Sequence, residues 1–216
     1  MVTYFAIPKA DFKIAVLGAS GVGKTALVKS FFRQQFAEQH IPTVDDYFIH
    51  TVLMNGHMLS LCIVDTSGTY SFPAMRRLAV SYCDAFIVVY SIDDPSSFTK
   101  AIEYLDEIHR LKKTQLEEKA IPVCFAANKL DLGDEERRIT GQQGQDEINN
   151  RTDLNGEYLE ISARLGFRTQ RAFFGILKQM MTSKDQKRLA KRTRKRIQKK
   201  VKMFCWNKAS ENDVNC

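Results

Sequence analysis

A glycine-rich segment near the N-terminus, GASGVGKT at residues 18–25, constrains the fold of this chain more than any other feature. It follows an apolar run of strand length, Phe12–Gly18, and opens a predicted helix over Gly23–Gln34. Glycines in such a loop let backbone N–H groups turn inward around phosphates, and the helix N-terminus adds positive potential. In this context the pattern G-x-x-x-x-G-K-[ST] predicts a nucleoside triphosphate site, although it does not specify which triphosphate.

The side chains of this loop have distinct expected roles. We expect Lys24 to reach the terminal phosphates and Thr25 to supply a hydroxyl to Mg²⁺. The rest of the phosphate-binding loop is expected to comprise Ser20, Gly21, Val22, Gly23 and Ala26. A flexible glycine turn without a ligand is the alternative, and the flanking strand and helix argue against it.

Apolar runs of strand length recur after this loop, as expected for strands buried on both faces. They are Leu59–Asp65, Ala85–Ile92, Val123–Asn128 and Tyr158–Ser162. A more alternating run, Asp46–Met54, ends at the turn signal Asn55-Gly56 and is expected to pair antiparallel with the next strand. Helical patterns cover Ser96–Lys113 and Phe167–Met181. The sequence therefore predicts an α/β fold with a six-stranded, mostly parallel sheet, one antiparallel edge strand and helices on both faces.

A second polar loop, Asn128-Lys129-Leu130-Asp131, ends a predicted strand about a hundred residues after the first. Guanine presents two donors, N1–H and the 2-amino group, and a fixed carboxylate such as Asp131 accepts both. Lys129 is expected to lay its stem along the base, and Asn128 to tie loops together. The segment Glu160-Ile161-Ser162-Ala163-Arg164, at the end of the last strand, is expected to complete this pocket with backbone donors to the base oxygen. Its expected binding residues are Ser162, Ala163 and Arg164.

Five segments, GASGVGKT, IPTVDDY, DTSG, NKLD and EISAR, occur in the order and spacing of the Ras superfamily, which residues 11–182 resemble. The stretch that begins at Asp65 is most similar to the Dexras/Rhes branch, although the chain ends in DVNC and not in C-a-a-X. The resemblance implies a P-loop NTPase (small G-protein) fold and a monomeric signalling switch. It also implies that GTP and GDP bind with Mg²⁺ and that GTP is hydrolysed. The expected organisation is an N-terminal extension at 1–11, a GTPase domain at 12–182 and a basic tail at 183–216.

The resemblance also assigns roles to the two segments that respond to the nucleotide. It implies that Thr43 binds Mg²⁺ and senses the γ-phosphate, and that Asp65 holds Mg²⁺ through water. The Gly68 N–H is expected to meet the γ-phosphate, and Phe36 to pack against guanine. The implied catalytic set is Lys24, Thr43, Gly68 and Thr69. Effectors are expected to contact Val44, Asp45, Asp46 and Tyr47 together with the segment after Asp65, and an exchange factor and an activating protein are implied.

Several positions depart from the family pattern. Thr69 stands where most relatives carry the glutamine that orients the attacking water, and Ser67 replaces an alanine. Ser20 replaces a glycine of Ras itself, and His40 replaces a tyrosine. We therefore predict intact GTP binding with slow hydrolysis. The alternatives are a constitutively GTP-bound scaffold regulated by abundance or location and, disfavoured by NKLD, a P-loop kinase.

Charge is unevenly distributed along the 216 residues, whose formal net charge is +7. Residues 1–183 sum to −2, which argues against nucleic-acid binding by the body of the protein, whereas residues 184–202 sum to +10. Within this basic run Leu189, Thr193, Ile197 and Val201 recur every four residues, an amphipathic pattern that suits an anionic membrane or a calmodulin-like groove.

Phe204-Cys205-Trp206 follows the basic run and makes Cys205 a palmitoylation candidate, so 184–206 predicts an anchor at the cytoplasmic face of the plasma membrane. A solvated tail, nuclear import and RNA binding are the alternatives. The five cysteines, of which the last is Cys216, have no paired spacing, and Cys62 and Cys124 are expected to be buried thiols. With no signal-peptide pattern and no apolar run of about 18 residues, we expect a reduced, intracellular protein.

Overall fold

The computed structural model describes residues 8–32, 46–66, 73–112 and 120–181. Two compact units divide the chain: the larger comprises Met1–His50 and Ser60–Met180, and the smaller comprises Thr51–Leu59 and Met181–Cys216. In the smaller unit the described residues form the end of a β-hairpin around Asn55-Gly56. The described residues of the candidate nucleotide site belong to the larger unit.

Six strands form a single sheet in the order β2-β3-β1-β4-β5-β6. They are β1 (Phe12–Gly18), β2 (Asp46–Met54), β3 (His57–Asp65), β4 (Ala85–Ser91), β5 (Ile121–Asn128) and β6 (Leu154–Glu160). All pairs from β3 to β6 are parallel. The two-residue turn Asn55-Gly56, with φ of 49° and 76°, joins β2 and β3 as an antiparallel hairpin. The predicted fold class is therefore confirmed.

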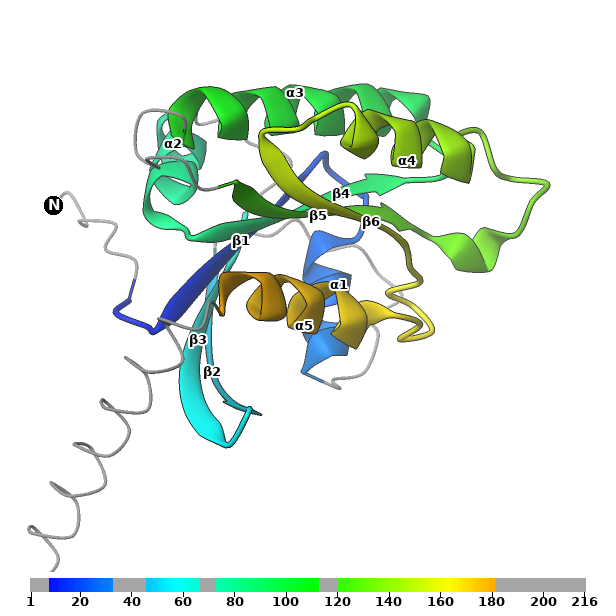
Figure 1. Ribbon diagram of the computed structural model, residues 1–216. Helices are drawn as coiled ribbons and strands as arrows, with labels where there is room; N and C mark the ends of the chain where they lie inside the picture. The colour runs from blue at the N-terminus through cyan, green and yellow to red at the C-terminus, as the bar shows by residue number, and fades with distance from the viewer. Residues whose placement is uncertain (1–7, 33–45, 67–72, 113–119, 182–216) are drawn as a thin grey trace, which may run out of the picture. The chain divides into compact units, whose positions relative to one another are not determined.

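Helices cover both faces of the sheet, which explains why the central strands are apolar throughout. Helices α1 (Lys24–Phe31) and α5 (Thr169–Met180) lie on one face. The opposite face carries α2 (Pro73–Tyr82), α3 (Pro95–Lys112) and α4 (Gly141–Asn149), as Figure 1 shows. Every residue of β4 is buried, and the core around it includes Tyr90 and Phe125, whose ring centroids are 5.0 Å apart.

Two polar contacts join α2 to α3 and so fix the helix that follows residues 67–72. Arg76 Nε donates to Glu107 Oε2 at 2.5 Å, and the Arg76 guanidinium lies over the Tyr104 ring. Lys112 Nζ donates to the carbonyl oxygen of Ser81 at 2.8 Å. Because Glu107 and Lys112 are both buried, each contact satisfies a charge that would be costly without a partner.

The elements differ from expectation mainly at the C-terminal half of the chain. β6 runs from Leu154 to Glu160, and not from Tyr158 to Ser162, because Ser162 leaves the strand to form an antiparallel bridge with Phe167. Because Phe167 forms that bridge, α5 begins at Thr169, two residues later than predicted. Helices α2 and α4 were not predicted. The amphipathic pattern of residues 184–202 lies outside the described residues, and the expected domain boundaries stay a prediction.

The expected burial of two thiols is confirmed. Cys62 and Cys124 are buried and unpaired, as is Cys83. Desolvation by burial raises the pKa of Cys83 to about 12 and raises the pKa values of the other two thiols. All three are therefore thiols rather than thiolates near neutral pH, so they act as packing groups.

Candidate functional site

The predicted site lies along the edge of the sheet where the parallel strands end. The loop after β1 holds the phosphate-binding motif, and the loop after β5 holds Asn128-Lys129-Leu130-Asp131. The C-terminal ends of β3 and β6 place Asp65 and the 161–164 segment at the same edge. This is the position at which open α/β sheets bind ligands.

Three glycines shape the phosphate-binding loop. Gly18, Gly21 and Gly23 all have positive φ, at 152°, 76° and 95°. A Cβ on Gly18 would lie 2.3 Å from the carbonyl oxygen of Val89, and one on Gly23 would lie 2.3 Å from Asn128 Nδ2. A Cβ on Gly21 would meet nothing within 4 Å. Gly18 therefore lets β1 approach β4 closely, Gly23 leaves room for the Asn128 side chain, and Gly21 faces open space.

Lys24 and its neighbours provide the phosphate end of the site. Lys24 is only 6% exposed, and its Nζ donates to the carbonyl oxygen of Ala19 at 2.8 Å, so the ammonium lies across the loop. Val22 is buried beneath the loop, Ser20 is exposed on it, and Ala26 is half-buried in the first turn of α1. The loop thus holds a cation at the N-terminus of a helix, the arrangement that suits a bound anion.

Thr25 and Asp65 meet as the sequence predicts for a metal site. Thr25 Oγ1 donates to Asp65 Oδ2 at 2.6 Å, and Asp65 is fully buried at the end of β3. Thr66 Oγ1 donates to the carbonyl oxygen of Val16 at 2.7 Å and so holds that strand end against β1. A hydroxyl from the first turn of α1 and a carboxylate from the end of β3 fit Mg²⁺, which prefers oxygen ligands. Within the described ranges, no group of three or more His, Cys, Asp or Glu offers another metal site.

The side chain of Asn128 connects the two ends of the site. Its Nδ2 donates to the carbonyl oxygen of Val22 at 2.7 Å, and its Oδ1 accepts from the Ala163 N–H at 2.9 Å. Asn128 is 2% exposed, so both bonds are shielded from water. The expectation that this residue ties loops together is confirmed by these contacts.

Asp131 and Ser162, the residues expected to bind the base, are in contact. Ser162 Oγ donates to Asp131 Oδ1 at 2.6 Å and also accepts the N–H of Leu165. Asp131 is mostly covered, and the Arg164 guanidinium lies 3.9 Å from its other oxygen. A carboxylate held in this way is pre-oriented to accept hydrogen bonds from a ligand.

Lys129 has a partner that the sequence analysis did not identify. Its Nζ lies 3.3 Å and 3.4 Å from the two carboxylate oxygens of Asp93, in the loop after β4. Partial burial of Asp93 disfavours its charged form, but the bond from Ser91 and the Lys129 ammonium hold its pKa below the ordinary value. Lys129 itself adopts a left-handed φ of 69°. The position of Asp93 after a parallel strand was the signal that could have identified it.

Much of the predicted nucleotide-sensing machinery lies outside the described residues. This group comprises Phe36, His40, Thr43, Val44, Asp45, Ser67, Gly68 and Thr69. Asp46 is the first residue of β2, and Tyr47 is half-buried and packs against the core. The roles expected for all these residues stay predictions.

The contrast between two loop glycines gives a direct test of the contact with Asn128. Gly21→Ala and Gly23→Ala both place a side chain at positive φ, which costs about 1 kcal/mol. Only Gly23→Ala displaces the Asn128 amide, so we expect it to lose about 2 kcal/mol more of the free energy of unfolding. Chemical denaturation of both variants measures the difference, and equal losses would contradict the assigned contact.

Comparison with known proteins agrees with this geometry. The family model described as Ras family matches residues 13–182. The chain is 34% identical to the human GTP-binding protein Rhes over 177 residues, or 77% of this chain and 63% of Rhes. It is 32% identical to the mouse GTP-binding protein Rit2, over 84% of this chain and 80% of that protein. It is also 32% identical to Ras-like protein 1 of Saccharomyces cerevisiae, over 78% of this chain and 52% of that protein.

The chain thus spans less than two thirds of the length of the Rhes proteins that it matches. The matched region nevertheless covers most of this chain, and it contains the phosphate-binding loop, Asp65 and the base-reading loop. By fold, by site and by sequence, this chain belongs to the Ras family of small GTPases.

Proposed function

We propose that this protein is a signalling switch that binds GTP or GDP with Mg²⁺ and hydrolyses GTP slowly. The observation that carries the proposal is the pair of hydrogen bonds from Asn128, which join a phosphate-binding loop to a base-reading loop. A nucleotide that occupies both ends of this site must place its phosphates near Lys24 and its base near Asp131. The names of the relatives Rhes and Rit2, both GTP-binding proteins, support the same ligand.

At the phosphate end, the chain supplies charge and orientation. The Lys24 ammonium and the N–H groups of the loop would hold the β- and γ-phosphates. Thr25 and Asp65 would hold Mg²⁺, together with the predicted ligand Thr43, and the bound ion neutralises charge on the phosphates. Contacts of Thr43 and Gly68 with the γ-phosphate would be lost on hydrolysis, and this loss would release the effector-binding segments.

At the base end, the chain supplies selectivity. The carboxylate of Asp131, held by Ser162, would accept N1–H and the 2-amino group of guanine, whereas adenine offers neither donor in that arrangement. A site built to accept two hydrogen bonds rejects a ligand that cannot make them by several orders of magnitude. A phosphate-transferring kinase, the rival activity for a loop of this type, has no need of such a carboxylate.

Competition between nucleotides tests the proposed ligand. We expect the purified protein to prefer GTP over ATP by at least about a thousandfold. Asp131→Ala should remove most of that preference because it removes the acceptor. The matched control is Glu135→Ala, four residues further on, where the side chain is exposed. Competition of GTP and ATP against a fluorescent guanine nucleotide measures this preference in the wild type and in each variant. Equal affinity of the wild-type protein for GTP and ATP would refute the proposal.

Slow hydrolysis is proposed from three departures at the phosphate end, Ser20, Ser67 and Thr69. A threonine is too short to orient the attacking water from the backbone position of a glutamine. Exposed Ser20 lies on the loop where an activating protein would insert an arginine. The alternative, a scaffold that stays bound to GTP, differs from this proposal only in having negligible turnover, so the measured rate decides between them.

Single-turnover hydrolysis with the wild type and Thr69→Gln measures this rate. The wild type should hydrolyse GTP more slowly than ordinary Ras, and Thr69→Gln should raise the rate by about tenfold or more because the amide can orient water. A wild-type rate equal to that of Ras would contradict slow hydrolysis. An unchanged rate in the variant would show that Thr69 is not the limiting substitution.

The partners proposed for this switch follow from the family. Effectors would bind Val44, Asp45, Asp46 and Tyr47 in the GTP-bound state, with the segment after Asp65. An exchange factor and an activating protein would control nucleotide exchange and hydrolysis. The GTPase domain itself would act as a monomer. None of the helices in the described part of the chain is long and apolar enough to cross a membrane.

The basic segment 184–206 is proposed to hold the protein at the cytoplasmic face of an anionic membrane, most simply the plasma membrane. Each basic residue near such a surface contributes about 1 kcal/mol, and one lipid chain together with a polybasic run suffices for stable binding. Phe204 and Trp206 suit the interface, and Cys205 between them would carry the lipid. Nuclear import directed by the same basic run is the alternative localisation.

Imaging of the N-terminally tagged full chain separates the two addresses. The wild type should outline the plasma membrane, and Cys205→Ser should move a large part of it into the cytosol because the lipid is lost. Cys216→Ser, which changes the other cysteine of the tail, is the control and should keep the membrane signal. Membrane binding that survives Cys205→Ser would refute the lipid, and a nuclear wild type would refute the membrane address.

A further inference from the structure

Four side chains form a hydrogen-bonded network at the end of β6, beside the base-reading loop. Arg137 Nη1 donates to Glu160 Oε1 at 2.8 Å, and the Tyr158 hydroxyl donates to the same oxygen at 3.2 Å. The Tyr90 hydroxyl lies 3.4 Å from that of Tyr158 and is placed to donate to it in turn. A single carboxylate oxygen therefore accepts from β6 and from the segment that follows Asp131.

The two hydroxyls remain donors near neutral pH. Burial raises the pKa of Tyr90 to about 12. Burial, followed by the contacts with Tyr90 and Glu160, raises the pKa of Tyr158 well above its ordinary range. Neither tyrosine adds a negative charge, so Glu160 is the acceptor on which both Arg137 and the tyrosines converge. Such chains of hydrogen bonds reinforce one another in a poorly solvated place.

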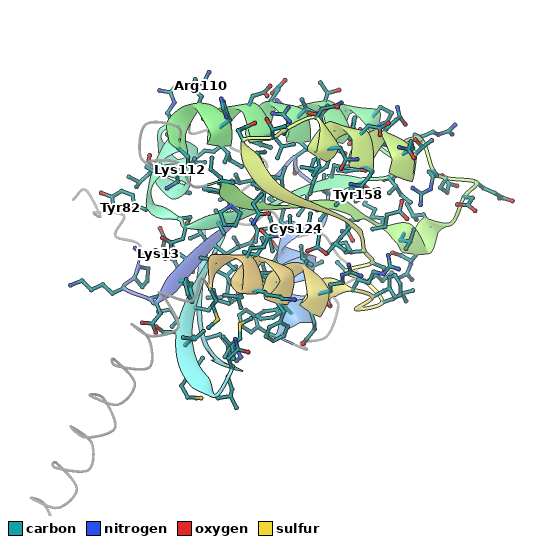
Figure 2. The ribbon with its side chains drawn as sticks, viewed as in Figure 1. Lys13, Tyr82, Arg110, Lys112, Cys124 and Tyr158 are labelled. Atoms are coloured by element: carbon teal, nitrogen blue, oxygen red, sulfur yellow. The ribbon has the colours of Figure 1, made fainter. Side chains whose placement is uncertain are left out.

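Helix α4 comes unusually close to this network. A Cβ on Gly144 would lie 2.3 Å from Tyr158 Cε2 and 2.6 Å from the Tyr90 hydroxyl. A Cβ on Gly141 would lie 3.0 Å from Glu160 Oε1. The absence of side chains at these two positions lets the first turns of the helix lie over the network, on the side of β6 where Figure 2 labels Tyr158. The helix thus limits the access of water to the carboxylate.

Both flanks of Asp131 depend on this network. Glu160 lies two residues before Ser162, whose Oγ donates to Asp131 Oδ1 at 2.6 Å. Arg137 lies six residues after Asp131, and its guanidinium also donates to the carbonyl oxygen of Ile139 at 3.2 Å. The ion pair between Arg137 and Glu160 therefore joins the segment after Asp131 to the strand that leads to Ser162.

We propose that Glu160 is a positioning residue for base recognition, which holds Asp131 and Ser162 at the spacing that guanine requires. Arg137 and Tyr158 fix its carboxylate, and Tyr90 supports Tyr158. This inference rests on the proposed function, because it assigns a role within the same nucleotide site. It assigns a side-chain role to Glu160, the first residue of EISAR, and it adds Arg137 and the two tyrosines, which lie outside the five family segments.

A positioning role for Glu160 predicts a change in base selectivity, which a contact that only stabilises the fold would not cause. Loosening Glu160 should disturb the two hydrogen bonds to the base more than the contacts of Thr25 and Asp65, which lie on α1 and β3. Inosine diphosphate lacks the 2-amino group of guanine and makes only one of the two bonds to Asp131. The ratio of affinities for GDP and IDP therefore reports on the position of Asp131.

The experiment compares the full-length wild type with Glu160→Gln by using a fluorescent GDP analogue, with GDP and IDP as competitors. We expect Glu160→Gln to release the GDP analogue about tenfold faster, because it removes a charged partner of Arg137. The ratio of affinities for GDP over IDP should fall by at least about threefold. Chelation of Mg²⁺ should accelerate release by the same factor in both proteins.

Glu157→Gln is the matched control. Glu157 lies on the same strand, its side chain is 29% exposed against 25% for Glu160, and it pairs with Arg171 at 3.0 Å. This ion pair joins β6 to α5 and touches neither flank of Asp131. We expect release rates, the GDP-to-IDP ratio and the effect of chelation to stay within about twofold of the wild type.

The proposal is overturned if Glu160→Gln behaves like Glu157→Gln, or if the affinities for GDP and IDP fall by the same factor. Should Glu160→Gln fail to fold, Tyr158→Phe removes a single hydroxyl. It is expected to accelerate GDP release about threefold and to lower the GDP-to-IDP ratio, and an unchanged ratio would again overturn the proposal. A wild type with no preference for guanine nucleotides would instead refute the proposed function.

Discussion

The side-chain amide of Asn128 is the interaction on which the geometry of the site depends. With one donor and one acceptor it binds the carbonyl oxygen of Val22 and the N–H of Ala163, so three loops share a single buried group. Gly23 leaves room for this amide, since a Cβ there would lie 2.3 Å from its nitrogen. The phosphate end and the base end are consequently parts of one rigid unit, and not two separate motifs.

Glycines at other positions also allow close contacts, because the absence of a side chain lets a backbone or a ring come near. Gly18 brings β1 against the carbonyl oxygen of Val89, and Gly144 brings α4 against Tyr158. Close approach in turn excludes water from polar contacts, which become stronger and more costly to break. Binding energy for a ligand can then be used for recognition, because the loops are already in place.

Sequence reasoning predicted the elements that carry motifs, because their glycines and apolar runs impose local structure. β1 and β2 have their predicted bounds, and α3 is shifted by one residue. Sequence reasoning did not predict α4, because the two glycines of this helix lower its helix propensity. A capping box between Thr140 and Gln143 stabilises the start of the helix. Sequence reasoning misplaced β6 because Asn155 and Gly156 are poor strand formers, and pairing with β5 overrides their preference.

The same distinction holds within the site. Lys24, Thr25, Asp65, Asn128, Asp131 and Ser162 could be named from the sequence, since each has an expected role that fixes its residue type and spacing. Asp93 pairs with Lys129, and Glu160 pairs with Arg137, through side-chain contacts between segments far apart in sequence. Such contacts form only in the folded chain, so no local sequence pattern predicts them.

The central claim is that this chain is a guanine-nucleotide switch with slow hydrolysis, and analysis of its bound nucleotide tests it most directly. The protein is isolated from cells with Mg²⁺ present, and the nucleotide that it releases on denaturation is identified by chromatography. We predict about one guanine nucleotide per chain, with GTP in excess of GDP. Adenine nucleotide, or no nucleotide, would contradict the switch, and a preparation that holds almost only GDP would contradict slow hydrolysis.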